Sequence, residues 1–145
     1  MKPFEYKTIV RFSDTDLYGV VHHSNYFKWL EEARIQLLEE IIGLDVAWME
    51  KESLRFPVIK VEGKYKKSVF AREKITVNTY LYYDGTAKLT FQYEVLDEDE
   101  KVCFAGKTEH AVLHGDRMLL RMPDDFDRRI REKIKEYGEG YIIVC

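Results

Sequence analysis

The sequence predicts an α+β fold in which one long helix covers one face of an antiparallel sheet. Three observations lead to this fold class. Apolar residues recur at three- and four-residue steps over residues 24–43, as in an amphipathic helix. Four later segments alternate apolar and polar residues, as in strands that bury one face. The connections between those segments are short, which favours antiparallel neighbours.

The first expected elements are a strand and the long helix. Residues 4–12 alternate and predict the strand. Ser24 is a suitable N-cap for the helix, because a serine hydroxyl can accept a hydrogen bond from a first-turn N–H group. Gly43 is a suitable end, because glycine readily adopts the left-handed conformation that closes many helices. Residues 45–52 are compatible with one further helical turn.

A meander of strands is expected in the second half of the chain. The segments with strand periodicity are residues 58–70, 74–83, 87–96 and 101–114. Asp84 and Gly85 lie between two of them and form a strong hairpin signal, because both residue types tolerate positive φ. Helical spacing then returns from about Pro123 and predicts a short C-terminal helix ending at Gly138.

Length and composition suit one domain over residues 1–145. Hydrophobic residues make up 46% of the 145 residues, which is enough for a packed core. The net charge of −3 gives no basic field, so nucleic acid is not an expected partner. Cys103 and Cys145 make no disulfide or zinc framework. We expect a cytoplasmic protein with no signal peptide and no membrane span, since no run of about 18 apolar residues occurs.

Polar residues crowd the start of the long helix, in the stretch SDTDLYGVVHHSNYFKWLEEAR. A helix N-terminus carries roughly half a positive charge and unpaired N–H groups, which stabilise carboxylates and oxyanions. Asp16 can therefore be an ionised nucleophile or base beside N–H groups that polarise a carbonyl, an arrangement that suits acyl transfer. Gly19 permits a tight turn, and Val20 and Val21 offer an apolar lining.

Simpler interpretations of these residues stay open. An aspartate before a helix is most often a cap or part of an Asx-turn, and this interpretation suits Asp14 better than Asp16. On spacing alone, His22 and His23 are compatible with solvated or packed side chains near a helix start. Asn25 is compatible with a residue that ties the first helical turn.

No metal or cofactor is expected. Strand geometry would place His110 and His114 about 13 Å apart, too far to share one ion at Zn–N distances of about 2 Å. The adjacent pair His22 and His23 makes a poor chelate without further ligands. Cys103 lies in a predicted strand and suits a small packed residue. No phosphate-binding loop, dinucleotide fingerprint or nucleophile elbow is present.

The stretch DTDLYGVVHHSNYFKWLEEAR resembles the signature of the hotdog-fold thioesterases of the 4-hydroxybenzoyl-CoA thioesterase and YbgC type. The resemblance covers the chain to about Arg121, which implies that about 122–145 is a C-terminal extension. The sequence departs from the pattern of the 4-hydroxybenzoyl branch, because it has His22 and His23 where that branch has bulky apolar residues. This difference favours the range of acyl-CoA substrates of the YbgC-like branch. The matched positions are Asp16, Gly19, Val20, Val21, His22, His23, Asn25, Tyr26 and Trp29.

The resemblance implies a long central helix wrapped by a five-stranded antiparallel sheet, and homodimers or homotetramers formed through sheet edges. It implies hydrolysis of acyl-CoA, with Asp16 attacking the thioester or activating water, and the N–H group of His23 polarising the carbonyl. The His23 side chain would position substrate or water. Substrate would contact Gly19, Val20, Val21, His22, Asn25 and Tyr26, and Trp29 would fill the core or line the acyl pocket. Candidates for the CoA phosphates are Lys64, Lys66, Lys67 and Arg72, although a solvated strand face explains these side chains equally well.

Two other functions stay open at this point. A hotdog dehydratase acting on acyl thioesters would need a histidine with an acidic partner on the helix, and the Asp-x-x-Gly pattern argues against it. A non-catalytic acyl-CoA binder would not need Asp16. The sequence does not distinguish CoA from acyl carrier protein as the thiol carrier, nor does it define the acyl chain.

Overall fold

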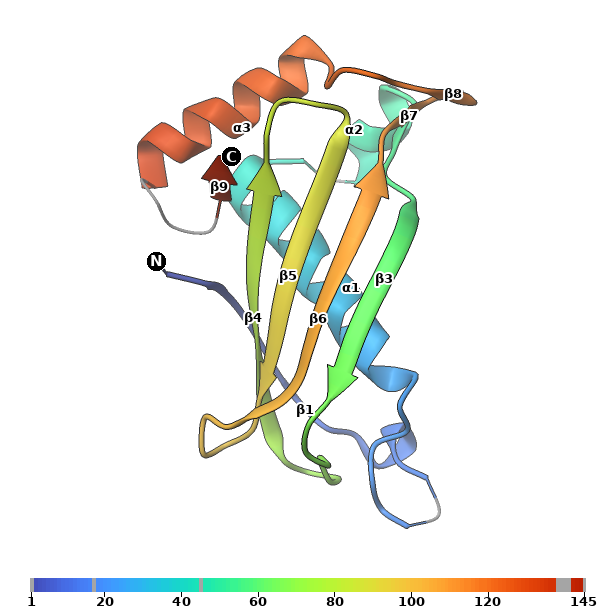
Figure 1. Ribbon diagram of the computed structural model, residues 1–145, viewed down its shortest axis with the longest axis vertical. Helices are drawn as coiled ribbons and strands as arrows, with labels where there is room; N and C mark the ends of the chain where they lie inside the picture. The colour runs from blue at the N-terminus through green and yellow to red at the C-terminus, as the bar shows by residue number, and fades with distance from the viewer. Residues whose placement is uncertain (1, 17, 45, 138–141, 145) are drawn as a thin grey trace.

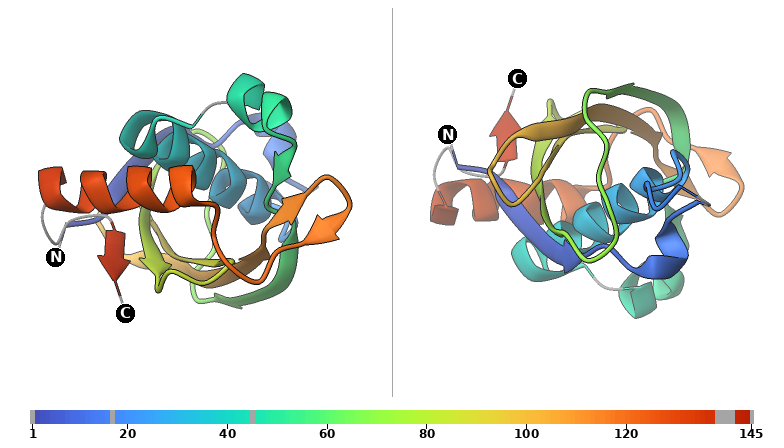
Figure 2. Two further views of the ribbon diagram at one scale, coloured as in Figure 1. Left: turned by 90° about the horizontal axis from the view of Figure 1, so that it is seen from above. Right: turned by 90° about the horizontal axis from the view of Figure 1, so that it is seen from below.

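A curved antiparallel sheet wraps one long helix (Figures 1 and 2). The computed structural model describes residues 2–16, 18–44, 46–137 and 142–144. Neighbouring strands in the main sheet are antiparallel along the order β1-β4-β5-β6-β3. This is the hotdog arrangement that the sequence predicts. The strands are β1 (Phe4–Ile9), β3 (Val58–Tyr65), β4 (Lys74–Tyr83), β5 (Lys88–Leu96) and β6 (Val102–Ala111).

The helix α1 (Asn25–Leu37) begins directly after Ser24, as predicted. It continues into a π-helical turn, η2 (Leu38–Ile42), and ends at Gly43 with φ of +80°. Glycine adopts this left-handed conformation at little cost, which explains the predicted end. The apolar stripe of α1 lies against the concave face of the sheet, and its buried residues are Tyr26, Trp29, Leu30, Ala33 and Leu37.

Two predicted strands are shorter than expected. The first ends at Ile9 because the chain turns into η1 (Phe12–Asp14), where the Asp14 carboxylate accepts the N–H group of Arg11 at 3.0 Å. The segment expected over residues 58–70 ends as β3 at Tyr65. Alternation of side chains continued beyond both strand ends, so the pattern alone did not mark them.

A small second sheet was not predicted. The segment 101–114 divides after Ala111, and β7 (Leu113–His114) then pairs with β2 (Leu54–Arg55) and β8 (Arg117–Met118). Strands of two residues are too short for a period of two to show in the sequence. The helix α2 (Val46–Lys51) leads into this small sheet and corresponds to the expected helical turn at 45–52.

The C-terminal helix α3 (Asp124–Tyr137) crosses the end of the molecule at which α1 finishes (Figure 1). Tyr83 donates a hydrogen bond to Asp127, and the ring of Phe126 lies 5.2 Å from that of Phe56. The strand β9 (Ile142–Val144) then pairs parallel with β4, which the sequence did not predict. Gly138 and Cys145 lie outside the described residues. The division into one domain with an extension from about residue 122 stays a prediction.

Candidate active site

Asp14 fixes the turn that precedes α1. Its carboxylate is buried and accepts hydrogen bonds from the N–H group of Arg11 at 3.0 Å and from Lys28 at 3.3 Å. Its carbonyl oxygen accepts from the N–H group of His22 at 3.0 Å and from the side-chain amide of Asn25 at 2.7 Å. Hydrogen bonds to a charged group contribute about 1.5–3 kcal/mol each. Asp14 is therefore the turn residue that the sequence indicated, and Asn25 ties the first turn of the helix to it.

Asp16 lies on a tight, exposed loop. Its Oδ1 atom accepts the N–H group of Tyr18 at 2.8 Å, which makes an Asx-turn. Its carbonyl oxygen accepts the N–H group of Gly19 at 3.1 Å, and Gly19 has φ of +76°, as its predicted role in a turn requires. The second carboxylate oxygen of Asp16 has no hydrogen-bond partner among the residues that the structure describes.

Two neighbouring bridges fix this loop, one by closing its base and the other by joining it to the segment that precedes β4. Thr15 pairs with Val21, and Val20 pairs with Phe70. The N–H group of Val21 also donates to the carbonyl oxygen of Val69 at 2.9 Å. Val21 is buried in the core and Val20 is half-buried, so the loop is fixed at its base while Asp16 stays exposed.

The helix start leaves an N–H group available for a ligand. The hydroxyl of Ser24 lies 2.8 Å from Nδ1 of His22 and caps none of the first-turn N–H groups, which differs from its predicted role. The N–H group of Asn25 donates to the carbonyl oxygen of His22 at 2.9 Å. Within the described ranges no group accepts the N–H of His23. This donor meets the chemical requirement for polarising a carbonyl oxygen.

A cavity of about 290 Å³ has His23 among its lining residues. It brings together four of the predicted site residues, whereas Asp16, Gly19, His22 and Asn25 do not line it. The cavity joins the loop and helix start to the chain that follows β3. Its lining residues are Val20, Val21, His23, Tyr26, Tyr65, Lys66, Lys67 and Ser68.

Tyr65 and Ser68 were not predicted as site residues. The hydroxyl of Tyr65 donates to the carbonyl oxygen of His23 at 2.9 Å, over a sequence separation of 42 residues. Alternation in the sequence placed Tyr65 in a strand but gave no sign that the strand end meets the helix start. Trp29 packs against Tyr26 with ring centres 5.2 Å apart and is buried in the core.

The phenol groups of the cavity have pKa values above the ordinary value of tyrosine. Burial raises the pKa of Tyr26 to about 12, and it raises the pKa of Tyr65 as well. Both side chains are therefore neutral hydrogen-bond donors at physiological pH.

The basic candidates for the CoA phosphates differ in their surroundings. Lys66 and Lys67 line the cavity, whereas Lys64 lines a separate depression between β3 and β6. Lys67 also forms an ion pair with the buried carboxylate of Asp97, which raises the pKa of the ammonium group. Arg72 lies at a turn with φ of +73° and lines neither depression.

The remaining histidines and Cys103 lie outside the candidate site, either in the core or on the surface. His110 is buried, and its Nδ1 donates to the carbonyl oxygen of Phe56 at 2.9 Å. His114 is exposed on β7. Cys103 is buried in β6, and burial raises the pKa of its thiol. In the part of the chain that the structure describes, no group of three or more metal-ligating side chains occurs.

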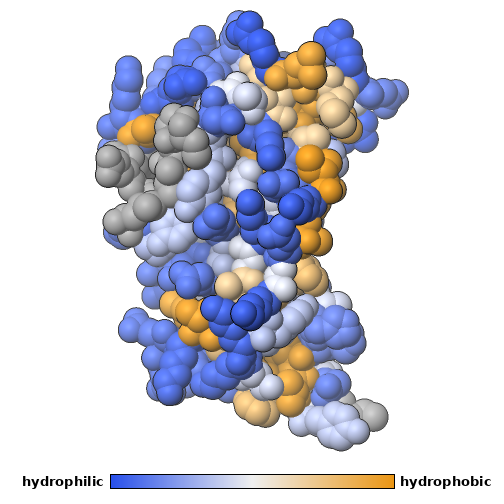
Figure 3. Space-filling view, in the orientation of Figure 1, coloured by the Kyte–Doolittle hydropathy of each residue, from blue (hydrophilic) through white to orange (hydrophobic). Residues whose placement is uncertain are grey.

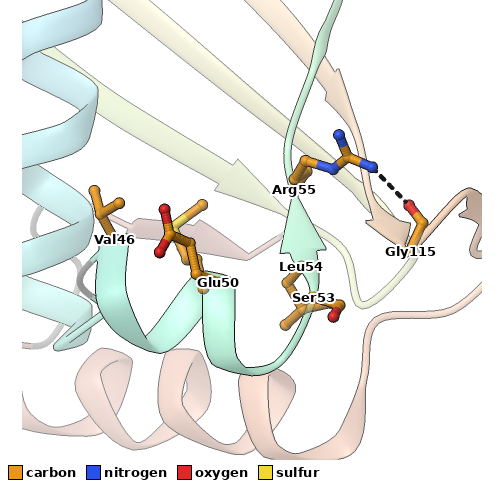
Figure 4. Close-up of a pocket in the computed structure, with 7 residues that line it drawn as sticks. Val46, Glu50, Ser53, Leu54, Arg55 and Gly115 are labelled. Carbon is orange, nitrogen blue, oxygen red and sulfur yellow. Dashed lines mark hydrogen bonds between the residues drawn. The ribbon is translucent and has the colours of Figure 1, made fainter.

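A second cavity, of about 460 Å³, lies between α2 and the small sheet (Figure 4). Arg55 crosses its rim and donates to the carbonyl oxygen of Gly115 at 3.1 Å. The start of α1 lies at the opposite end of the molecule (Figure 1). None of the predicted site residues lines this second cavity, whose walls are formed by Val46, Met49, Glu50, Ser53, Leu54, Arg55 and Gly115.

Comparison with known proteins identifies similar sequences and structures. Residues 10–130 match the family model of the thioesterase-like superfamily. A putative esterase of Aquifex aeolicus is 33% identical over 117 residues, which are 81% of this chain and 90% of that protein. The putative acyl-CoA thioesterase YneP of Bacillus subtilis is 28% identical over 101 residues, which are 70% of this chain and 72% of that protein.

A solved structure agrees with the fold. The DHNA-CoA thioesterase of Staphylococcus aureus superposes with a TM-score of 0.82 at 27% identity, over 99% of this chain and 100% of that one. No helix in the described segments is long and apolar enough to cross a membrane.

Proposed function

The chain belongs to the thioesterase-like superfamily, and on that premise we propose that it hydrolyses an acyl-CoA thioester to a carboxylic acid and CoA. One observation carries the proposal: His23, whose N–H group has no acceptor among the described residues, lines a cavity at the helix start, next to the loop that exposes Asp16. The relatives support the same chemistry, because YneP is described as a putative acyl-CoA thioesterase and the Staphylococcus aureus protein as a DHNA-CoA thioesterase.

The proposed reaction proceeds through a tetrahedral oxyanion. The Asp16 carboxylate either attacks the thioester carbon, forming an anhydride that water then hydrolyses, or removes a proton from a water molecule that attacks instead. The electron pair of the C=O bond moves to oxygen, where the N–H group of His23 stabilises it. The C–S bond then breaks, and the CoA thiolate takes up a proton.

The other cavity residues receive binding roles in this proposal. Val20, Val21 and Tyr26 contact the acyl group, while Gly19, His22 and Asn25 shape the loop and the helix start around it. The His23 side chain positions substrate or water. Lys66 is the best placed of the basic candidates for a CoA phosphate, because it lines the cavity, is exposed and is not held by Asp97 as Lys67 is. We assign the protein to the YbgC-like branch on the resemblance, and to the cytoplasm because two cysteines without a disulfide framework suit a reducing compartment.

We also propose that the protein is a homodimer or a homotetramer. The outer edge of β3 pairs with no other described strand, and this strand is exposed along its whole length. Apolar residues follow this edge in Figure 3, and Val58, Ile59 and Val61 are 45%, 58% and 49% exposed. An unpaired edge of this kind is a template for another strand, here that of a second copy.

The test is thiol release from short, long and aromatic acyl-CoA substrates by the wild type and by Asp16→Asn. We expect turnover to fall by about a hundredfold or more, which corresponds to about 2.7 kcal/mol of transition-state stabilisation. Asp84→Asn is a matched control, because Asp84 forms a similar Asx-turn with Thr86 at 2.9 Å, in the hairpin between β4 and β5 at the other end of the molecule. Equal turnover in the wild type and in Asp16→Asn would exclude Asp16 from the reaction.

A second candidate function is acyl-CoA binding without hydrolysis. It is favoured by the contact between Asp16 and Tyr18, which gives the carboxylate a structural partner, and by the absence of Asp16 from the cavity lining. Binding of CoA thioesters with no turnover of any substrate would support this candidate against hydrolysis. Incorporation of ¹⁸O from labelled water into the Asp16 carboxylate in a single turnover would instead identify a nucleophile.

A further inference from the structure

We propose that Tyr65 is a positioning residue, whose hydroxyl holds the peptide group after His23 so that the N–H group of His23 points into the cavity. This inference rests on the proposed function and adds a residue from β3 to it. Tyr65 is the last residue of that strand, and its hydroxyl lies 2.9 Å from the carbonyl oxygen of His23.

The direction of the His23 N–H group depends on two peptide groups. The peptide between His22 and His23 carries this N–H, and its carbonyl oxygen accepts the N–H group of Asn25 at 2.9 Å. The peptide between His23 and Ser24 has its N–H group 3.3 Å from Nδ1 of His22 and its carbonyl oxygen bonded to Tyr65. Within the described residues, the bond from Tyr65 is the only hydrogen bond that joins this second peptide to the sheet.

The ring of Tyr65, which carries this hydroxyl, is packed against two other aromatic rings. Its ring centre lies 5.0 Å from that of Phe104, which pairs with Tyr65 across β3 and β6, and 5.2 Å from that of Tyr26. Phe104 rests on a cross-strand pair of glycines. A Cβ atom at Gly63 would lie 2.5 Å from the Phe104 ring, and one at Gly106 would lie 2.7 Å from it. The glycine pair therefore provides the space that lets Phe104 support Tyr65.

Tyr65 also meets the chemical requirement for this role. A carbonyl oxygen needs a donor, and the neutral phenol provides one. Burial raises the pKa of Tyr65, so the phenol stays protonated over the pH range in which thioester hydrolysis is assayed.

The expected consequence is a loss of kcat with little change in KM. An oxyanion donor stabilises the transition state more than the bound substrate, so a misdirected N–H group slows the chemical step. Removal of one such donor costs about 10²–10³ in kcat. Tyr65→Phe leaves the donor present but less well directed, so we expect kcat to fall by about tenfold to a hundredfold, with KM changed by less than about twofold.

Tyr65→Phe is compared with Tyr83→Phe, measuring kcat, KM and amide hydrogen exchange over residues 22–27. Both changes delete one phenol hydroxyl and keep the ring, and the hydroxyl of Tyr83 contacts Asp127 of α3, remote from the cavity. We expect Tyr65→Phe alone to lower kcat and to accelerate amide exchange at the helix start. Tyr83→Phe is expected to keep wild-type kcat even though it lowers the melting temperature.

The outcomes separate this inference from the proposed function. Wild-type kcat in Tyr65→Phe, or an equal loss in Tyr83→Phe, would overturn the positioning role. Unchanged amide exchange in Tyr65→Phe would overturn the anchoring of the peptide, whatever the activity. A wild-type protein that hydrolyses no thioester would overturn the proposed function itself, while the exchange data would still decide whether Tyr65 holds the helix start.

Discussion

The hydroxyl of Thr108 donates a hydrogen bond to Nε2 of His110 across 2.9 Å in the interior of the sheet. The direction follows from the other end of the ring, because Nδ1 can only donate to the carbonyl oxygen of Phe56. A neutral imidazole then has Nε2 as its acceptor. Thr108 in turn accepts from the hydroxyl of Tyr93 at 2.7 Å. Protons in this buried chain are therefore ordered in one direction from Tyr93 to Phe56.

This arrangement predicts an acid-sensitive fold. Burial lowers the pKa of His110 from 6.5 to about 4. Between these values the unfolded chain takes up a proton that the folded chain does not. The contribution to stability is therefore complete above pH 6.5 and is lost as the pH falls toward 4, by about 3 kcal/mol. Urea unfolding of the wild type and of His110→Gln from pH 7.5 to pH 4 measures this loss. The unfolding free energy of the variant should depend less steeply on pH.

The exposed His114 provides the control for this measurement. His114→Gln should follow the wild-type dependence of unfolding free energy on pH. Parallel curves for the wild type and His110→Gln would contradict the assignment of the acid sensitivity to His110.

A second prediction concerns the buried hydroxyl of Thr79. This side chain is fully buried in β4, and its Oγ1 atom has no hydrogen-bond partner in the described structure. Thr79→Val replaces the hydroxyl with a methyl group of similar size, so we expect a gain of about 1 kcal/mol in unfolding free energy. Thr108→Val is the matched contrast, since its hydroxyl is bonded to Tyr93 and His110, and it should lose about 1–3 kcal/mol. A stability loss in Thr79→Val of the size seen in Thr108→Val would show that Thr79 has a partner.

A third prediction separates backbone strain from function at Gly19. Gly19 and Gly115 have φ of +76° and +61°, and a Cβ atom at either would meet nothing within 4 Å. Alanine at each position therefore costs mainly the strain of a left-handed residue, about 1–2 kcal/mol. We expect similar losses of melting temperature in Gly19→Ala and Gly115→Ala, and a loss of turnover in Gly19→Ala alone, because only that turn carries Asp16. Full activity in Gly19→Ala would indicate that the exact shape of this turn does not matter for hydrolysis.

The sequence predicts those parts of the fold that depend on local periodicity. The helix from Ser24 to Gly43 and the alternating strands β4 and β5 follow from the spacing of apolar residues and from one hairpin signal. The end of β3 at Tyr65 does not follow from the spacing of apolar residues, because apolar and polar residues keep alternating in the sequence beyond the end of the strand. The parallel pairing of β9 with β4 could not be predicted from local periodicity either, because it joins residues that are about 60 positions apart in the chain.

The same division holds for the candidate site. Asp14, Gly19 and the helix start lie within one short stretch, so capping and turn chemistry indicate how they are arranged. The bond from Tyr65 to His23 and the glycines beneath Phe104 arise only when β3 and β6 pair and meet the helix. The chemistry of a helix start indicated Asp16 as a candidate nucleophile or base, and resemblance added the roles of His23. These roles stay predictions until turnover is measured.

The strand order has a consequence for how the protein folds. Turns of a few residues join β4, β5 and β6, so their pairing closes short loops. Pairing of β1 with β4 brings Phe4 to Thr79, and pairing of β3 with β6 brings Tyr65 to Phe104. Closing these longer loops costs more chain entropy, which favours early formation of the meander and late docking of the two outer strands. The Asp16 loop lies inside the first long loop and Tyr65 at the start of the second, so a chain that has formed the meander alone holds neither half of the site.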